Sequence, residues 1–194
     1  VLRQPLEDRQ ITISRSKMSV TYPASFMLVA AMNPCPCGHY GDPNHACTCT
    51  PGQIHRYKSR ISGPLLDRID IQCEVQAVPY TMLKDMHPGE SSAVIRKRVM
   101  HARKIQEERF RNSKVHCNAQ MTAKMVRQYC QIDEQGDKLL QSSMDAFGLS
   151  ARAYDRILKV ARTIADLAGE PHILASHLME AISYRSLDRD SWGE

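Results

Sequence analysis

The stretch GLSARAYDRILKVARTIADL, residues 148–167, carries a start signal and a spacing that are typical of an amphipathic helix. Ser150 follows Gly148 in the position of a helix N-cap. Apolar side chains then recur along one stripe of the helix, at Ala153, Ile157, Val160, Ala161, Ile164 and Leu167. Because such a stripe must be buried against other elements, the stretch predicts one member of a helical bundle.

Other segments in this half of the chain also have helical patterns. Together with that stretch, the predicted helices cover residues 90–112, 122–130, 134–147, 150–168 and 174–186. Pro79, Pro88 and Gly89 mark a boundary region before the first of them. We therefore expect residues 81–194 to form an all-α domain and the chain as a whole to be mostly helical.

Residues 9–22 precede this half and have the pattern of a β-hairpin. Apolar and polar side chains alternate, pause at the basic tip Arg15-Ser16-Lys17 and resume as MSVTY. The pattern predicts two short strands with cationic side chains at the turn.

Two apolar segments predict further strands. The run FMLVAAM, residues 26–32, has the continuous apolar character of a strand buried on both faces of a parallel sheet. The segment IDIQCEV, residues 69–75, predicts another strand, and a helix is expected near residues 53–60. Residues 1–80 are thus expected to form an α/β domain.

The charge balance permits an anionic partner without requiring one. The chain has 26 Lys and Arg against 21 Asp and Glu, a net charge of +5. Much of the basic excess lies in residues 96–111, and the simplest interpretation is a solvated helix face on which Glu107 and Glu108 pair with nearby cations.

The distribution of apolar residues argues against a membrane protein. No apolar run reaches the ~18 residues that a membrane span needs. The N-terminal residues VLRQPLEDRQ also lack the basic-then-apolar form of a signal peptide. We expect a cytoplasmic protein with no membrane partner.

Four of the seven cysteines form two Cys-x-Cys pairs, Cys35 with Cys37 and Cys47 with Cys49. In a reducing compartment thiols stay free unless a metal binds them, so the cluster favours a metal over disulfides. Four thiolates bind Zn²⁺ tetrahedrally and leave no open position, which predicts a structural zinc site.

Alternatives to this four-cysteine site remain open, because the usual zinc knuckle is Cys-x₂-Cys. One sulfur could be replaced by His39, His45 or His55, or the loop could hold no metal. The other cysteines, Cys73, Cys117 and Cys130, are interpreted as buried or inert thiols.

Asn33 directly follows the predicted strand 26–32. In open α/β sheets ligands bind beyond the carboxyl ends of the strands, so a polar residue at this position is a candidate for chemistry.

Four stretches carry a resemblance to a known family: PLEDRQITISR, YPASFMLVAAMNPCPCG, RISGPLLDRIDI and GLSARAYDRILKVARTIADL. Together they resemble the C-terminal part of the magnesium-chelatase-like AAA+ ATPases of the YifB and ComM type. The resemblance covers nearly the whole chain. It implies the C-terminal part of an AAA+ core followed by a helical lid domain, in a ring of subunits, expected to be a hexamer, that binds ATP and Mg²⁺ at subunit interfaces.

The resemblance also implies roles for single residues. Asn33 matches sensor 1, which contacts the γ-phosphate and orients the attacking water. Arg68 matches the arginine finger, which reaches the γ-phosphate of the neighbouring subunit. Arg152 matches sensor 2, and Arg156 is a weaker candidate for that role.

The hairpin tip occupies the place of the hairpin that in helicase relatives points into the channel of the ring. Arg15 and Lys17 are therefore candidates for sequence-independent DNA contacts, which should weaken with salt. The resemblance implies helicase or branch-migration activity for the complete protein.

The Walker A motif G-x₄-G-K-[ST] does not occur in the sequence. The resemblance implies that the chain begins just after the Walker B segment of the family, so the chain alone is expected to be inactive as an ATPase. Two other functions remain open: the ATPase subunit of a machine that inserts a metal into a tetrapyrrole, and a non-enzymatic zinc-stabilised module that binds nucleic acid or protein.

Overall fold

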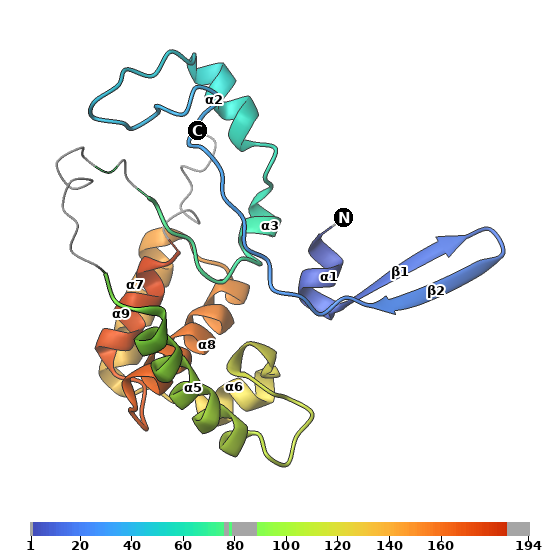
Figure 1. Ribbon diagram of the computed structural model, residues 1–194, viewed down its shortest axis with the longest axis vertical. Helices are drawn as coiled ribbons and strands as arrows, with labels where there is room; N and C mark the ends of the chain where they lie inside the picture. The colour runs from blue at the N-terminus through green and yellow to red at the C-terminus, as the bar shows by residue number, and fades with distance from the viewer. Residues whose placement is uncertain (1, 76–77, 79–88, 186–194) are drawn as a thin grey trace. The chain divides into compact units, whose positions relative to one another are not determined.

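The computed structural model of the protein describes residues 2–75, 78 and 89–185 (Figure 1). The described residues up to Ile69 form one compact unit, and those from Asp70 onward form a second. The domain boundary predicted near residue 80 stays a prediction, because residues 79–88 lie outside the described residues.

The first unit begins with a short helix, α1 (Arg3–Asp8), which the sequence patterns do not predict. It ends at Arg9, whose φ of 55° is left-handed and whose N–H donates to the carbonyl of Pro5. This reversal leads the chain directly into the first strand of the hairpin.

The predicted hairpin is confirmed. Strands β1 (Gln10–Arg15) and β2 (Met18–Pro23) pair antiparallel, with Arg15 opposite Met18. Two cross-strand hydroxyl pairs stabilise it: Thr12 Oγ1 lies 3.0 Å from Thr21 Oγ1, and Ser14 Oγ lies 2.8 Å from Ser19 Oγ. The register therefore places residues 16 and 17 at the turn, and Figure 1 shows the two strands as a ribbon that extends beyond α1.

The two other predicted strands, residues 26–32 and 69–75, are wrong for the described structure, in which neither segment has strand pairing. Met27 and Val29 are 86% and 81% exposed. A strand buried on both faces needs neighbouring strands, and within the described part of the chain only β1 and β2 pair. The apolar run thus has the composition of a buried strand without a sheet to join.

Two helices complete the first unit. Helix α2 (Pro51–Lys58) begins two residues before its predicted start, because Thr50 and Gln53 form a capping box. The Thr50 hydroxyl accepts from the Gln53 N–H at 3.3 Å, and the Gln53 side chain accepts from the Thr50 N–H at 2.9 Å. The short helix α3 (Gly63–Leu66) follows and has proline in its first turn.

The second unit is helical, as predicted. Its elements in the described residues are α5 (Ser92–Arg109), the 3₁₀ turn η1 (Asn118–Gln120), α6 (Ala123–Tyr129), α7 (Glu134–Phe147), α8 (Ala151–Ala168) and α9 (Ala175–Ser183). None of the helices in the described part of the chain combines the length and apolar character that a membrane crossing requires.

Helix α8 lies at the centre of this bundle and contacts α5, α6, α9 and η1. Ser150 is its N-cap, accepting from the Ala153 N–H at 3.2 Å, which confirms the predicted start. Ala153, Ile157 and Ala161 on the predicted stripe are fully buried. The small alanine side chains let neighbouring helices approach closely, and large apolar side chains from α7 and α9, such as Leu140 and Leu178, fill the remaining space.

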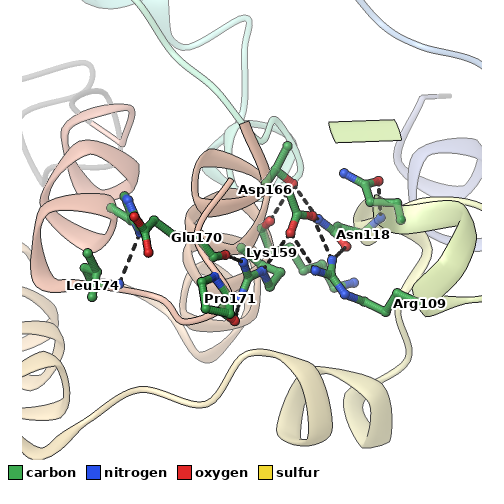
Figure 2. A network of polar contacts seen from close by, with 11 residues as sticks. Arg109, Asn118, Lys159, Asp166, Glu170, Pro171 and Leu174 are labelled. Atoms are coloured by element: carbon green, nitrogen blue, oxygen red, sulfur yellow. Dashed lines mark hydrogen bonds and ion pairs between the residues drawn. The ribbon is translucent and has the colours of Figure 1, made fainter. Parts of the chain in front are cut away.

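A buried polar network joins α5, η1 and α8 (Figure 2). The Asp166 carboxylate is fully buried and accepts from Arg109 Nη1 at 2.7 Å, Asn118 Nδ2 at 2.8 Å and Arg162 Nε at 3.1 Å. Burial raises the pKa of Asp166, but the hydrogen bonds from Arg109 and Asn118 outweigh burial and hold that pKa below its usual value. The basic run 96–111 is therefore only partly a solvated face, because Arg109 points inward.

Candidate functional site

The four cysteines of the loop between β2 and α2 lie together. The sulfur atoms of Cys35, Cys37, Cys47 and Cys49 are all within 4.8 Å of one another. Cys35 Sγ is 3.3 Å from Cys37 Sγ and 3.7 Å from Cys47 Sγ, and the Cys37 and Cys47 sulfurs are 3.5 Å apart. A tetrahedral zinc site with Zn–S bonds of about 2.3 Å has sulfur–sulfur edges of about 3.8 Å. The cluster could therefore hold a metal ion with little rearrangement.

Hydrogen bonds and burial shift the pKa values of these thiols in opposite directions. Hydrogen bonds from the His39 backbone N–H, the Cys35 thiol and the Thr48 backbone lower the pKa of Cys37 to about 5. Burial raises the pKa of Cys49 to about 12. The pKa of Cys35 is also lowered, whereas that of Cys47 is raised, so the surroundings favour thiolates in the first pair and thiols in the second. Ionising all four would require a cation among them.

A tight turn shapes the first cysteine pair. The Gly38 N–H donates to the Cys35 carbonyl at 3.1 Å, and Gly38 has a φ of 87°, a conformation that favours glycine. A β-carbon at Gly38 would lie 3.8 Å from Nδ2 of Asn33. The side-chain amide of Asn33 therefore lies beside the cysteine loop, and the Asn33 residue is exposed.

The nearby histidines do not join the cysteine cluster in the described structure. His39 and His45 instead group with Asp42, and the ligand atoms of these three residues lie within 4.8 Å of one another. His55 belongs to neither group. The prediction from sequence treats these histidines only as substitutes for a sulfur and omits Asp42. The sequence does contain a signal for this group, because His39 and His45 each lie three positions from Asp42.

Arg68 is held within the first unit by two partners. Its guanidinium forms an ion pair with Glu7 of α1, with Nε donating at 2.9 Å, and Nη1 donates to the Pro64 carbonyl. The Arg68 side chain is 11% exposed, whereas that of Glu7 is 43% exposed. The sequence patterns gave no sign of Glu7 as a partner, because 61 positions separate the two residues.

The candidate sensor 2 residues lie in the second unit, on α8. Arg152 is exposed in the first turn, and Arg156, one turn later, forms an ion pair with Asp70. Asn33 and Arg68 lie in the first unit, whereas Arg152 and Arg156 lie in the second.

The basic residues of the hairpin tip and the remaining cysteines complete the predicted set. Arg15 and Lys17 are both exposed. The sequence interpretation for the other cysteines was buried or inert thiols. Cys73 is exposed rather than buried, and Cys117 is half-buried. Cys130 is buried, as predicted, and burial raises its pKa to about 11.

Two family profiles match consecutive parts of the chain. The profile of magnesium chelatase, subunit ChlI, matches residues 1–83, and that of the ChlI C-terminal region matches residues 89–185. The chain therefore belongs to the magnesium-chelatase-like family of AAA+ ATPases, and its second unit is the helical lid domain of that family.

Individual relatives agree with this assignment. The chain is 47% identical to YifB of Escherichia coli over 190 residues and 45% identical to the competence protein ComM of Haemophilus influenzae over 189 residues. It is 35% identical to a protein of Mycobacterium tuberculosis over 184 residues. The matches cover 95–97% of this chain but only 36% of each relative, so the chain spans about a third of the length of these relatives.

Proposed function

We propose that the complete protein containing this chain is a ring-forming AAA+ ATPase that uses ATP hydrolysis to remodel DNA. Membership of the AAA+ family supports the ATPase part of the proposal. The observation that supports action on DNA is the exposed basic tip of the β1–β2 hairpin. The name of the relative ComM, a competence protein, agrees with a role on DNA, since competence is the uptake of DNA by cells.

In this proposal the chain supplies residues to the nucleotide site. Asn33 acts as sensor 1: its neutral amide can contact the γ-phosphate without competing with carboxylates for Mg²⁺. Arg152 acts as sensor 2 from the lid domain. Arg156, one turn later on α8, is the weaker candidate for the same role.

Arg68 acts as the arginine finger toward a neighbouring subunit. The Pro64 carbonyl and Glu7 fix its guanidinium at the C-terminal end of α3, which restricts the directions it can reach. Glu7 is partly exposed, so a phosphate of higher charge can replace it as the partner of Arg68. Such a finger contributes about 10³- to 10⁵-fold to the rate of phosphoryl transfer.

The cysteine cluster acts as a structural zinc site in this proposal. Four thiolates fill the coordination sphere, so the ion has no position for a reacting water. Its role is to fix a loop with little regular hydrogen bonding next to Asn33. Zinc at this position therefore supports the nucleotide site without taking part in hydrolysis.

The hairpin tip contacts the phosphate backbone of DNA. The cross-strand hydroxyl pairs and the antiparallel ladder hold the tip at the end of a defined ribbon. Two exposed cations there can neutralise phosphates without reading base sequence. Binding through such contacts releases counterions and must weaken as salt is added.

The test compares DNA binding by the complete protein and by the double variant Arg15→Ala/Lys17→Ala. We expect the variant to bind single-stranded DNA more weakly at low salt. The slope of log K against log salt should fall in magnitude by about 1.4, since each phosphate contact on a single strand contributes about 0.7. Filter binding or fluorescence anisotropy over a salt series gives both quantities.

A charge-matched control separates the tip from the general basic charge of the chain. The variant Arg103→Ala/Lys104→Ala removes two exposed cations from α5 and should keep the slope of the unmodified protein. Equal losses in both double variants would mean that the tip has no special role. No change in the tip variant would remove the DNA contact from the proposal.

The family description favours a second candidate, an ATPase subunit that drives insertion of a metal into a tetrapyrrole. ATP-dependent metal insertion by the complete protein with partner subunits would support it. DNA-stimulated ATP hydrolysis without such insertion would exclude it in favour of the first candidate. A non-enzymatic interaction module would gain support if the complete protein did not hydrolyse ATP under either condition.

A further inference from the structure

The loop that carries the cysteine cluster has a symmetric order of metal-binding side chains about Asp42. His39 and His45 lie three positions on either side of Asp42. Cys37 and Cys47 lie five positions away, and the outer cysteines, Cys35 and Cys49, lie seven positions away. The loop is therefore closed at its base by four sulfurs and carries two imidazoles and a carboxylate at its tip.

The three side chains at the tip converge on one point. Both imidazoles direct their Nδ1 atoms at the same carboxylate oxygen: His45 Nδ1 lies 3.1 Å and His39 Nδ1 lies 3.4 Å from Asp42 Oδ2. Neighbouring ligand atoms around a tetrahedral zinc with bonds of about 2.05 Å are about 3.4 Å apart. The two separations therefore match the edges of a coordination polyhedron.

The carboxylate is oriented independently of the histidines. The Asn44 backbone N–H donates to Asp42 Oδ1 at 2.8 Å, which leaves Oδ2 directed at the imidazoles. The Asp42 side chain is only 15% exposed, while those of His39 and His45 are 44% and 66% exposed. Metal-ligating carboxylates commonly have such an outer hydrogen bond, and the exposed histidines give an ion a path from solvent.

We propose that His39, Asp42 and His45 bind a second divalent transition-metal ion, of the zinc class, separate from the four-cysteine site. Two imidazole nitrogens and one carboxylate oxygen suit Zn²⁺, Co²⁺ or Ni²⁺, whereas Mg²⁺ and Ca²⁺ prefer oxygen ligands throughout. Three protein ligands leave at least one position of a tetrahedral ion for water. The two sites of the loop thus differ in kind, one closed and one open.

Metal titration of the 194-residue chain tests this proposal. After removal of metal under reducing conditions, Zn²⁺ or Co²⁺ is added and binding is followed by calorimetry and elemental analysis. We expect two ions per chain. With Co²⁺, one ion should show a thiolate-to-metal charge-transfer band, and the other should show only the d–d absorption of a nitrogen and oxygen site.

Variants assign the second ion to its ligands. Asp42→Asn and His45→Gln should each keep the ion with thiolate charge transfer. Each should weaken the other ion by more than about 100-fold, the upper range for loss of an outer-shell partner. His172→Gln, an exposed histidine of the second unit, is the matched control and should still bind two ions.

Three results would overturn the proposal. The first is a single ion per chain in the unmodified protein. The second is that Asp42→Asn loses both the thiolate-bound ion and the ion assigned to His39, Asp42 and His45. That result would mean that these three residues belong to the cysteine site. The third is retention of two ions in Asp42→Asn and His45→Gln alike. Failure of the DNA experiment leaves the metal result unaffected, so the two proposals can fail separately.

Discussion

At the scale of single residues, Arg68 has a structural partner and a proposed catalytic one. If Arg68 is the arginine finger, Arg68→Ala in the complete protein should lower ATP hydrolysis by about 10³-fold or more. Arg68→Lys should be nearly as slow, because an ammonium cannot reproduce the planar fork of donors. A steady-state phosphate-release assay measures both.

The variant Glu7→Gln is the control for the structural role of the same arginine. It removes the charge that pairs with Arg68 inside the unit but leaves the guanidinium available for phosphate. Its ATPase rate should stay within about threefold of the unmodified protein, since a partly exposed ion pair contributes only about 0–1 kcal/mol. A loss in Glu7→Gln as large as that in Arg68→Ala would show that the pair stabilises the fold and would argue against a finger.

Asp166 gives a prediction about stability and pH. Its pKa is held below the usual value in the folded state. The carboxylate therefore adds stability above its unfolded pKa of about 3.9, and that stability is lost as the pH falls through the lower folded pKa. Asp166→Asn should destabilise the helical unit by about 3–5 kcal/mol at pH 7, because two buried guanidiniums lose their counterion.

Urea unfolding followed by helical circular dichroism at pH 7 and from pH 5 to pH 2 measures this effect. The stability of Asp166→Asn should fall less steeply in acid than that of the unmodified chain. The control Asp145→Asn changes an exposed residue of α7 and should shift stability by at most about 0.5 kcal/mol. Equal acid sensitivity in Asp166→Asn and the unmodified chain would contradict the assignment.

At the scale of elements, the start of α8 depends on one hydroxyl. Ser150→Ala removes the acceptor for the Ala153 N–H and should cost about 1 kcal/mol in the free energy of unfolding. Ser142→Ala is the matched control: Ser142 is exposed within α7 and donates to the Lys138 carbonyl, so alanine there should be neutral or slightly stabilising. Equal destabilisation in both variants would contradict the cap.

The elements that the sequence predicts well are those whose partners lie close along the chain. The hairpin 9–22 follows from alternation and a short turn, and the α8 helix follows from its cap and stripe. The cysteine cluster was also predictable, because two short pairs can close on one ion. In each case local spacing carries the information.

Features that depend on distant partners were missed or wrong. The apolar run 26–32 has the composition of a buried strand, but composition cannot supply the strands that must flank it. Arg109 lies in a basic run that resembles a solvated face, and its partner Asp166 is 57 positions away. Asp42 was missed for a different reason, since its partners His39 and His45 lie only three positions away. A single aspartate in a polar loop is usually only a turn residue.

At the scale of the whole molecule, if the cysteine cluster binds zinc as proposed, removing the zinc should change the cysteine loop and leave the helical unit folded. The loop has little regular secondary structure, whereas the second unit has its own apolar core. Chelation should expose the four clustered thiols to a thiol reagent and cause less than about one tenth of the helical signal to be lost. The helical unit unfolding together with the loop would contradict this independence.

Zinc occupancy of the cysteine cluster should fall as the pH is lowered. If the four cysteines bind zinc as proposed, they bind it as thiolates, so this site should empty as the pH falls, and protons should be released when zinc binds near neutral pH. Elemental analysis after dialysis at a series of pH values measures the occupancy. Binding that did not change between neutral and acid pH would exclude thiolate ligands.

The most direct test of the proposed function is the rate of ATP hydrolysis by the complete protein with and without DNA. A DNA motor should hydrolyse ATP faster when DNA is bound, and Arg15→Ala/Lys17→Ala should reduce that stimulation while keeping the rate without DNA. ATP hydrolysis that is the same with and without DNA, or no hydrolysis at all, would contradict the proposal that this chain belongs to an ATP-driven machine acting on DNA.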